Sequence, residues 1–167
     1  MAEEKRLSGR VALVTGAAKR LGRAVALRLA EEGAELAVHY RRSANEAREV
    51  VGEAEKRGRH AASFSAELTS VPAIQKLFDD VAHHFGRLDI LVNSAANFLE
   101  TKFGETTESR WDSSLDTNLK APFFAHKPPL LILSVQAVES SSIFRTLGDC
   151  WGGASIFLIR FRRRESS

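Results

Sequence analysis

The first 125 residues alternate between short apolar runs and longer stretches with apolar residues at helical spacing. Short, wholly apolar runs are typical of strands covered on both faces, and the 3.6-residue spacing is typical of amphipathic helices. The predicted strands are 11–14, 35–40, 61–65 and 88–92, and the predicted helices are 21–32, 44–57, 71–85 and 110–124. Strands that alternate with helices of this length predict βαβ units with right-handed crossovers. The expected fold is therefore α/β, a Rossmann-type doubly wound parallel sheet.

This pattern ends near Ala125. His126, Lys127, Pro128 and Pro129 follow, and two prolines cannot continue a helix because they lack the N–H donor and crowd the preceding turn. Beyond them, only residues 155–161 have the composition of a strand. We therefore expect two parts, a dinucleotide-binding portion over 1–125 and a divergent, irregular tail over 126–167.

Composition changes this picture little. The chain has 167 residues, 44% hydrophobic and 27% charged, which suits a soluble globular domain. Four arginines near the end, Arg160 and 162–164, could contact nucleic acid or an acidic membrane, but a solvated tail is the favoured interpretation. The single cysteine, Cys150, allows no internal disulfide, and no apolar stretch is long enough to span a bilayer. We expect a cytoplasmic protein without nucleic-acid, membrane or metal partners.

The turn after the first predicted strand, from Thr15 to Gly22, is the first candidate for chemistry. A tight turn from a strand into a helix can hold a pyrophosphate with backbone N–H groups and the helix dipole. Gly16 and Gly22 suit this geometry, although two glycines alone also fit an ordinary turn. Arg20 stands where the middle glycine of the general motif is often found.

The end of the second predicted strand indicates which dinucleotide. An acidic residue there binds the ribose of NAD, whereas arginine binds the 2′-phosphate of NADP. This chain has Tyr40, Arg41, Arg42 and Ser43 in place of an acid. A solvated basic loop would look the same, but the distance from the turn favours NADP(H).

A third feature follows the strand at 88–92, where residues 93–98 read Asn-Ser-Ala-Ala-Asn-Phe. Small residues let the backbone approach a ligand, and this segment again lies at the carboxyl end of a strand. With the helix Trp-Asp-Ser-Ser-Leu-Asp-Thr-Asn at 111–118, these features resemble the short-chain dehydrogenase/reductase family over about 7–125. The turn and the His-Tyr-Arg-Arg-Ser segment are most similar to its pteridine reductase branch.

The resemblance implies roles for individual residues. Along the pyrophosphate it places Gly16, Arg20, Leu21 and Gly22. Around the adenosine ribose and 2′-phosphate it places Tyr40, Arg41, Arg42 and Ser43. It implies that Glu67 lies beside the adenine, that Asn93 and Ala95 lie near the cofactor, that Asn118 is the catalytic asparagine that holds a proton-relay water, and that Phe98 stacks on a pterin-like substrate. It also implies that the helix at 110–124 joins subunits of a homo-oligomer.

One part of the family pattern is missing. Hydride transfer leaves negative charge on the substrate, and a proton must neutralise it. The family supplies that proton from a Tyr-x-x-x-Lys pair, but here Tyr40 is the only tyrosine and no lysine follows Lys127. We expect either a carbonyl or pterin reductase by descent that is inactive as this chain, or a non-catalytic dinucleotide-binding remnant. A reading frame truncated or shifted after about Ala125 would explain the change in sequence.

Overall fold

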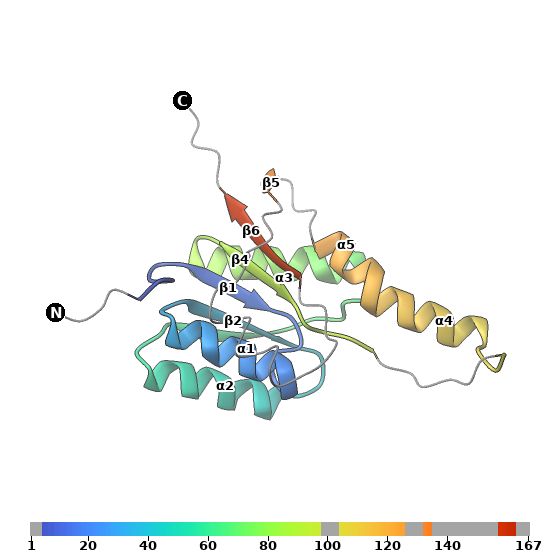
Figure 1. Ribbon diagram of the computed structural model, residues 1–167, viewed down its shortest axis with the longest axis horizontal. Helices are drawn as coiled ribbons and strands as arrows, with labels where there is room; N and C mark the ends of the chain where they lie inside the picture. Colours follow the sequence, from blue (N-terminus) through green and yellow to red (C-terminus); the bar gives the residue numbers. More distant parts are fainter. Residues whose placement is uncertain (1–4, 98–103, 126–131, 135–156, 163–167) are drawn as a thin grey trace.

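The described strands form one six-stranded sheet with helices on both faces (Figure 1). The computed structural model describes residues 5–97, 104–125, 132–134 and 157–162. The strands are β1 (Val11–Val14), β2 (Glu35–Tyr40), β3 (Ala61–Ser65), β4 (Ile90–Asn93), β5 (Ile132–Ser134) and β6 (Phe157–Arg162). The helices are α1 (Arg20–Glu31), α2 (Ala44–Lys56), α3 (Val71–Phe85), α4 (Glu108–Leu115), the π-helix η1 (Asp116–Lys120) and α5 (Ala121–Ala125).

The sheet order is β3-β2-β1-β4-β6-β5, and its first four strands are parallel. The predicted α/β Rossmann-type fold is therefore confirmed. The chain moves outward from β1 to β3 and then returns to place β4 on the other side of β1. Ligands of open α/β sheets bind outside the carboxyl ends of the strands at such a reversal, which here lies between β1 and β4.

Each face of the sheet has its own apolar core. Because successive strand residues point to opposite faces, Ala12 and Val14 pack with α1 and α2, whereas Leu13 packs with α3 and α5. All three side chains are fully buried. Figure 1 shows α1 and α2 together on one side of the sheet and α3 on the other. This double cover explains why the strands read as continuous apolar runs in the sequence.

The helix predicted at 110–124 is present but irregular. It runs through α4, η1 and α5, so that five residues in its middle have π-helical hydrogen bonding. Pro122 explains the wider turn, because it has no N–H to donate to the carbonyl four residues earlier and its ring crowds that carbonyl. Asn118 lies within this π-helical segment.

Two strands of the tail join the sheet. β6 pairs antiparallel with β4, and β5 pairs antiparallel with β6. The strand expected at 155–161 is thus found at Phe157–Arg162, within a segment for which the sequence predicted irregular structure. The change from parallel to antiparallel pairing at β4 separates the four βαβ strands from the added pair.

Candidate functional site

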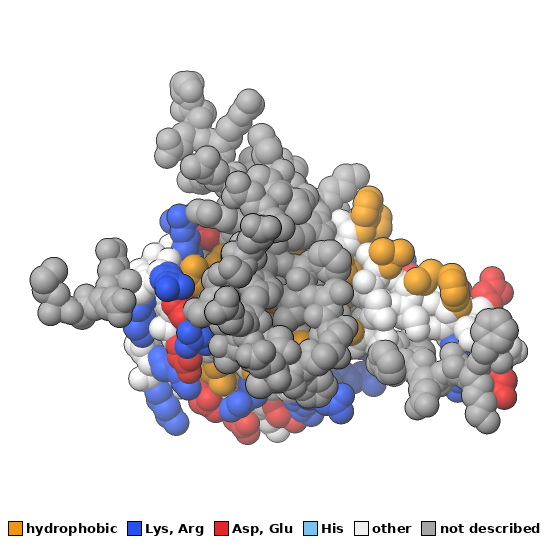
Figure 2. Space-filling model, viewed as in Figure 1, with side chains coloured by type: hydrophobic (Ala, Val, Ile, Leu, Met, Phe, Trp, Pro, Cys, Tyr) orange, Lys and Arg blue, Asp and Glu red, His pale blue; other side chains and the backbone are white. Residues whose placement is uncertain are grey.

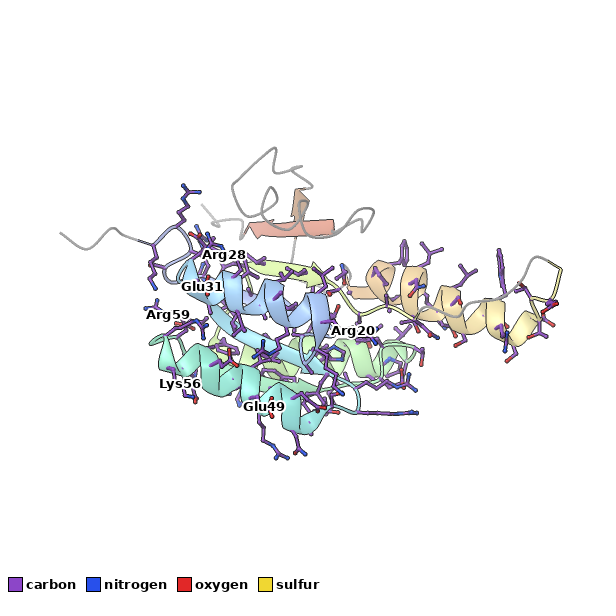
Figure 3. All side chains as sticks on the ribbon, turned by 60° about the horizontal axis from the view of Figure 1, so that its bottom comes forward. Arg20, Arg28, Glu31, Glu49, Lys56 and Arg59 are labelled. Carbon is purple, nitrogen blue, oxygen red and sulfur yellow. The ribbon has the colours of Figure 1, made fainter. Side chains whose placement is uncertain are left out.

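The residues that the sequence singled out gather at the carboxyl ends of β1, β2 and β4. The turn after β1, the basic segment after β2 and the small-residue segment after β4 all lie at this edge. Figure 3 shows Arg20 at the end of α1 that faces this edge, with Arg28 and Glu31 at the opposite end. The structure therefore brings together the three sequence features that lie up to 80 residues apart.

The turn after β1 has the backbone shape that its glycines predict. Gly16 has a φ of +65°, and a Cβ there would lie 2.9 Å from the Cα of Ala95. At Gly22 a Cβ would lie 2.3 Å from the carbonyl oxygen of Gly16, so α1 packs directly on the turn. Arg20 also has a positive φ, of 50°, which explains why glycine suits this position in the general motif. The path of the chain therefore requires glycine at positions 16 and 22, whereas Arg20 occupies a backbone conformation that glycine would adopt more readily.

The N-terminus of α1 is suited to an anion. Lys19 precedes the helix without capping it by a side-chain hydrogen bond, and its first turn holds no acidic residue. By contrast, α4 is capped by Thr107 and has Glu108 in its first turn. The first N–H groups of a helix lack internal partners and carry partial positive charge. This end of α1, where Leu21 and Gly22 stand, can therefore hold a phosphate group.

Thr15 joins the turn to the end of β4. Its Oγ1 accepts hydrogen bonds from the N–H groups of Ser94 and Ala95, each at 3.0 Å, and donates to the carbonyl of Val92 at 3.3 Å. Thr15 is 2% exposed. The sequence placed Ala95 near the site but assigned no role to Thr15. Its position directly before Gly16 was the signal that could have identified it.

The segment after β2 carries the predicted cationic groups. Arg41 Nε lies 2.6 Å from Glu67 Oε2, so two residues predicted for opposite ends of the adenosine form an ion pair. Arg42 is exposed and has no ion-pair partner among the described residues. Ser43 is the residue before α2, where its side chain makes no capping bond, and Tyr40 packs at the edge of the α1–α2 core.

A second ion pair crosses the site from the β1 turn to α2. Lys19 Nζ lies 2.7 Å from Glu46 Oε1, and the hydrogen bond from Lys19 lowers the pKa of the Glu46 carboxyl. Arg20, the neighbour of Lys19, is exposed and has no ion-pair partner in the part of the chain that is described. The positive charge available to an anion is therefore carried by Arg20 and Arg42.

His39, the next-to-last residue of β2, was not among the predicted site residues. Its Nδ1 lies 3.1 Å from the N of Gly16, and its Nε2 lies 3.2 Å from the carbonyl oxygen of Ala66. Burial lowers the pKa of its imidazole, against smaller opposing effects of the Ala66 carbonyl and of Glu67. A histidine inside an otherwise apolar strand was the available sequence signal.

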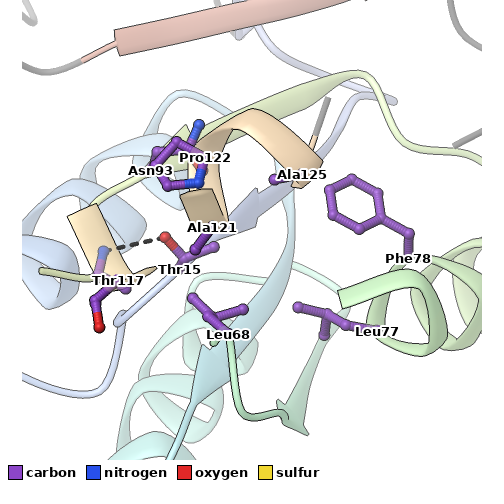
Figure 4. Close-up of a pocket in the computed structure, with 10 residues that line it drawn as sticks. Thr15, Leu68, Leu77, Phe78, Asn93, Thr117, Ala121, Pro122 and Ala125 are labelled. Atoms are coloured by element: carbon purple, nitrogen blue, oxygen red, sulfur yellow. Dashed lines mark hydrogen bonds between the residues drawn. The ribbon is translucent and has the colours of Figure 1, made fainter. Parts of the chain in front are cut away.

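A small pocket opens beside the end of β4 (Figure 4). Thr15 and Asn93 form one side, apolar residues of α3 such as Leu77 and Phe78 another, and Thr117 and Ala121 a third. The Nδ2 of Asn93 is buried and has no hydrogen-bond partner among the described residues. Asn93, which the sequence predicted to lie near the cofactor, thus keeps an available donor at this edge of the sheet.

The side chain of Asn118 connects the helix η1 to the segment after β4 by two hydrogen bonds. Its Oδ1 accepts a hydrogen bond from the N–H of Asn97, and its Nδ2 donates to the carbonyl of Asn97, each at 2.8 Å. The Nδ2 of Asn97 donates to Ser113 Oγ at 3.0 Å. The side chain of the predicted catalytic asparagine is therefore used to hold the backbone near the site. Phe98, the predicted substrate residue, lies outside the described residues.

Comparison with known proteins shows the family. The sequence pattern of the short chain dehydrogenase family matches residues 10–136, and this chain belongs to that family. The hydroxynaphthalene reductase-like protein Arp2 of Metarhizium brunneum is 41% identical over 118 residues, which cover 71% of this chain and 44% of that protein. The hydroxynaphthalene reductase arp2 of Aspergillus fumigatus is 42% identical, over 71% of this chain and 43% of its own length.

Solved structures give the same result. A short chain dehydrogenase from Burkholderia cenocepacia, in complex with NADP, has a TM-score of 0.70 and 40% identity over 72% of this chain and 49% of its own. A blue fluorescent protein from a metagenomic library, in complex with NADPH, has a TM-score of 0.68 and 35% identity over 71% of this chain and 49% of its own. The chain spans less than half the length of these relatives.

Two other kinds of site are absent from the described residues. No three side chains of the His, Cys, Asp and Glu types gather closely enough there to hold a metal ion. Within the same residues, no helix has both the length and the apolar character needed to cross a membrane.

Proposed function

We propose that this chain binds NADP(H) at the carboxyl edge of β1, β2 and β4. The observation that carries the proposal is that Arg20, at the uncapped N-terminus of α1, and Arg42, after β2, have no ion-pair partner among the described residues. The pyrophosphate would lie along Gly16, Arg20, Leu21 and Gly22. The 2′-phosphate would lie among Arg41, Arg42 and Ser43, since guanidinium groups bind phosphate through paired donors. NADP and NADPH in the two similar solved structures support this choice.

The site fits this cofactor better than NAD. No carboxylate ends β2 to accept hydrogen bonds from an unmodified ribose, and the acid nearest to Arg41 is Glu67 on a different strand end. When bound, the nicotinamide supplies or accepts a hydride. The residues of this chain would bind and orient it, with Asn93 and Ala95 at the end of β4 nearest to the reacting part.

For the whole protein, we propose reduction of a carbonyl or a pterin-like imine. The hydroxynaphthalene reductases among the relatives favour an aromatic substrate, and the Thr15–Gly22 and His39–Ser43 segments favour the pteridine reductase branch. Phe98 would contact the substrate and Asn118 would serve the proton relay. The single cysteine, Cys150, supports a cytoplasmic location.

For the 167 residues alone, we propose cofactor binding without turnover. The only tyrosine, Tyr40, is the last residue of β2, where we place the adenosine. No Tyr-x-x-x-Lys pair occurs in the sequence. The second candidate, a non-catalytic dinucleotide-binding remnant, rests on this same observation.

Calorimetry with NADP⁺ and NAD⁺ tests whether the chain binds NADP(H) in preference to NAD(H). Measurement of NADPH oxidation with pterins, quinones and ketones then tests whether the chain is inactive. NADP⁺ binding about tenfold or more tighter than NAD⁺, without oxidation, is expected from one charged phosphate contact. Equal affinities would contradict the assignment of Arg41, Arg42 and Ser43. Oxidation by this chain would show that another group delivers the proton.

We also propose that a second copy of the chain covers one face of α4, η1 and α5. Four exposed apolar side chains recur there every four residues: Trp111 at 59% exposure, Leu115 at 37%, Leu119 at 64% and Phe123 at 66%. In Figure 2, hydrophobic side chains, drawn in orange, form a row over the region of α4 and α5. Lys120 is already paired with Asp116 at 3.1 Å, so the exposed apolar row, and not charge, carries this proposal.

A further inference from the structure

His39 joins the strand β2 to the turn that follows β1. Its ring nitrogen Nδ1 lies 3.1 Å from the Gly16 N, and its own carbonyl accepts the N–H of Ala17 at 2.9 Å. Two successive N–H groups of the turn are therefore held by one residue. The first of these bonds depends on the side chain, and the second depends on the backbone alone.

These contacts decide which nitrogen of the ring carries the proton. The Gly16 N–H is a donor, so Nδ1 must offer a lone pair. The Ala66 carbonyl is an acceptor, so Nε2 must carry hydrogen. His39 is 2% exposed, and both its nitrogens are used. The ring that fits this site is the neutral Nε2–H form.

We infer that His39 is a positioning residue for the dinucleotide: its neutral ring holds the Gly16 N–H, sets the shape of the pyrophosphate-binding turn, and releases that turn when it is protonated. The inference rests on the proposed NADP(H) site. Protonation puts a hydrogen on Nδ1, where it meets the hydrogen of Gly16, so the bond cannot survive. The turn cannot shift toward the end of β4 to avoid the added hydrogen, because Gly16 approaches Ala95 so closely that even a Cβ would not fit between them.

The surroundings keep the ring neutral in the ordinary pH range. Burial lowers the pKa of His39, and the carbonyl of Ala66 and the charge of Glu67 oppose this effect without cancelling it. Glu67 is itself paired with Arg41. The turn contributes uncharged residues, Thr15, Gly16 and Ala17, and His39 lies on the same face of β2 as Ala37, which packs in the apolar core that holds Leu68 and Leu77. Glu67 is thus the charged group that acts on the ring.

Two variants separate the two hydrogen bonds. In His39→Asn, the amide oxygen takes the place of Nδ1 and can still accept from Gly16, but the bond to Ala66 is lost. In His39→Gln, the amide nitrogen takes the place of Nε2 and can still donate to Ala66, but the bond to Gly16 is lost. Each variant loses one hydrogen bond and the titrating group, so a purely structural role predicts similar effects for both.

We expect His39→Asn to bind NADP⁺ within about threefold of wild type at pH 8, and His39→Gln to bind about tenfold more weakly. As the pH falls from 8 through the lowered pKa of His39, the wild type should lose about threefold or more in affinity relative to His39→Asn. The 2′-phosphate titrates near pH 6, but it does so for both proteins and cancels in their ratio. Thermal unfolding of all three proteins at pH 8 verifies that they are folded.

If the two variants weaken NADP⁺ binding equally, the positioning role is overturned. If the ratio of the NADP⁺ affinities of wild type and His39→Asn stays constant as the pH falls, the link to protonation is overturned. If the wild type binds no NADP⁺ at any pH, the proposed function fails. The imidazole ¹⁵N shifts then test the inference without any ligand. A ring with Nδ1 protonated at pH 8 would overturn it, whereas the Nε2–H form would support the contact with Gly16.

Discussion

Arg41 and Glu67 form an ion pair across the ends of β2 and β3, with 2.6 Å between Nε and Oε2. The arginine follows β2 and the glutamate follows β3, and these strands are paired in parallel, so their ends lie side by side. The pair leaves the proposed 2′-phosphate site with a cation that already has a partner and with a carboxylate close to the incoming charge. The binding of NADP(H) must therefore compete with Glu67.

Removing the carboxylate charge in Glu67→Gln should strengthen NADP⁺ binding. The change frees Arg41 and removes a repulsion, and for exposed groups this is worth about 0.5–1 kcal/mol, or roughly two- to fivefold in Kd. NAD⁺, which lacks the phosphate, should show little change. Calorimetry with both dinucleotides measures the difference. Glu49→Gln is a matched control, because it removes the same charge from the exposed side of α2. Weaker NADP⁺ binding by Glu67→Gln would mean that the pair orients Arg41 for the phosphate.

The packing of α1 on the β1 turn gives a second prediction. A Cβ at Gly22 would lie 2.3 Å from the carbonyl oxygen of Gly16, and backbone atoms cannot move aside easily. Gly22→Ala should lower the free energy of unfolding by about 3 kcal/mol and abolish NADP⁺ binding. Urea unfolding and calorimetry measure the two effects.

Gly52 provides the control for this substitution. It lies within α2, and a Cβ there would meet nothing within 4 Å. Gly52→Ala should raise the free energy of unfolding by about 0.5–1 kcal/mol, because alanine loses less backbone entropy in a helix. If the free energy of unfolding of Gly22→Ala equalled that of Gly52→Ala, α1 could not pack against the turn as closely as the structure shows.

Asp89 should make stability depend on acid pH. Burial raises the pKa of its carboxyl, but hydrogen bonds from Arg87, the Val11 N–H and Arg10 outweigh burial and lower it. The folded-state pKa therefore lies below the ordinary value of 3.8. The stabilisation is fully present above pH 3.8 and is lost as the pH falls through the folded-state pKa.

Asp89→Asn should lower the free energy of unfolding by about 1–3 kcal/mol at pH 7, since two arginines and one buried N–H lose their charged acceptor. The difference from wild type should shrink only as the pH falls below 3.8 and through the lowered folded-state pKa, where the wild-type carboxyl becomes protonated. Chemical unfolding across pH 2–7 measures it. Asp79→Asn on the exposed face of α3 is the control, and a loss of equal size there would rule out the Asp89 network as the cause.

Local patterns predicted most of the fold. Strands β1, β2 and β3 and helix α3 have the expected bounds, and the other βαβ elements differ by one or two residues at their ends. An apolar run favours a strand, and a glycine ends a helix, through interactions with residues only a few positions away. Such features can therefore be predicted from the sequence alone. The same holds for the turn at Gly16 and for Arg20, whose positive φ fits its place in the motif.

What the sequence did not show depends on contacts between distant residues. The bonds from Thr15 to the end of β4 and from His39 to Gly16 join residues that only the sheet order brings together. The π-helix at Asp116–Lys120 is a different case, because its apolar pattern does not differ from that of an α-helix. The pattern therefore predicted a helix here but not its wider turn. The sequence predicted a strand at 155–161, but nothing in its composition indicates that this strand, β6, pairs antiparallel with β4.

The apolar row on α4, η1 and α5 gives the last prediction, which concerns assembly. Leu119 and Phe123 are more than 60% exposed and lie one turn apart on the same face. If a second copy covers this face, Leu119→Asp should shift the protein from dimer to monomer, because the pair would bury a charge without a partner. Light scattering coupled to size-exclusion chromatography measures the mass. Ser109→Asp adds the same charge about 200° around the helix from Trp111, two residues away, and should leave the mass unchanged. A wild type that is monomeric at all concentrations, or a dimer that survives Leu119→Asp, would exclude this face as the contact between copies.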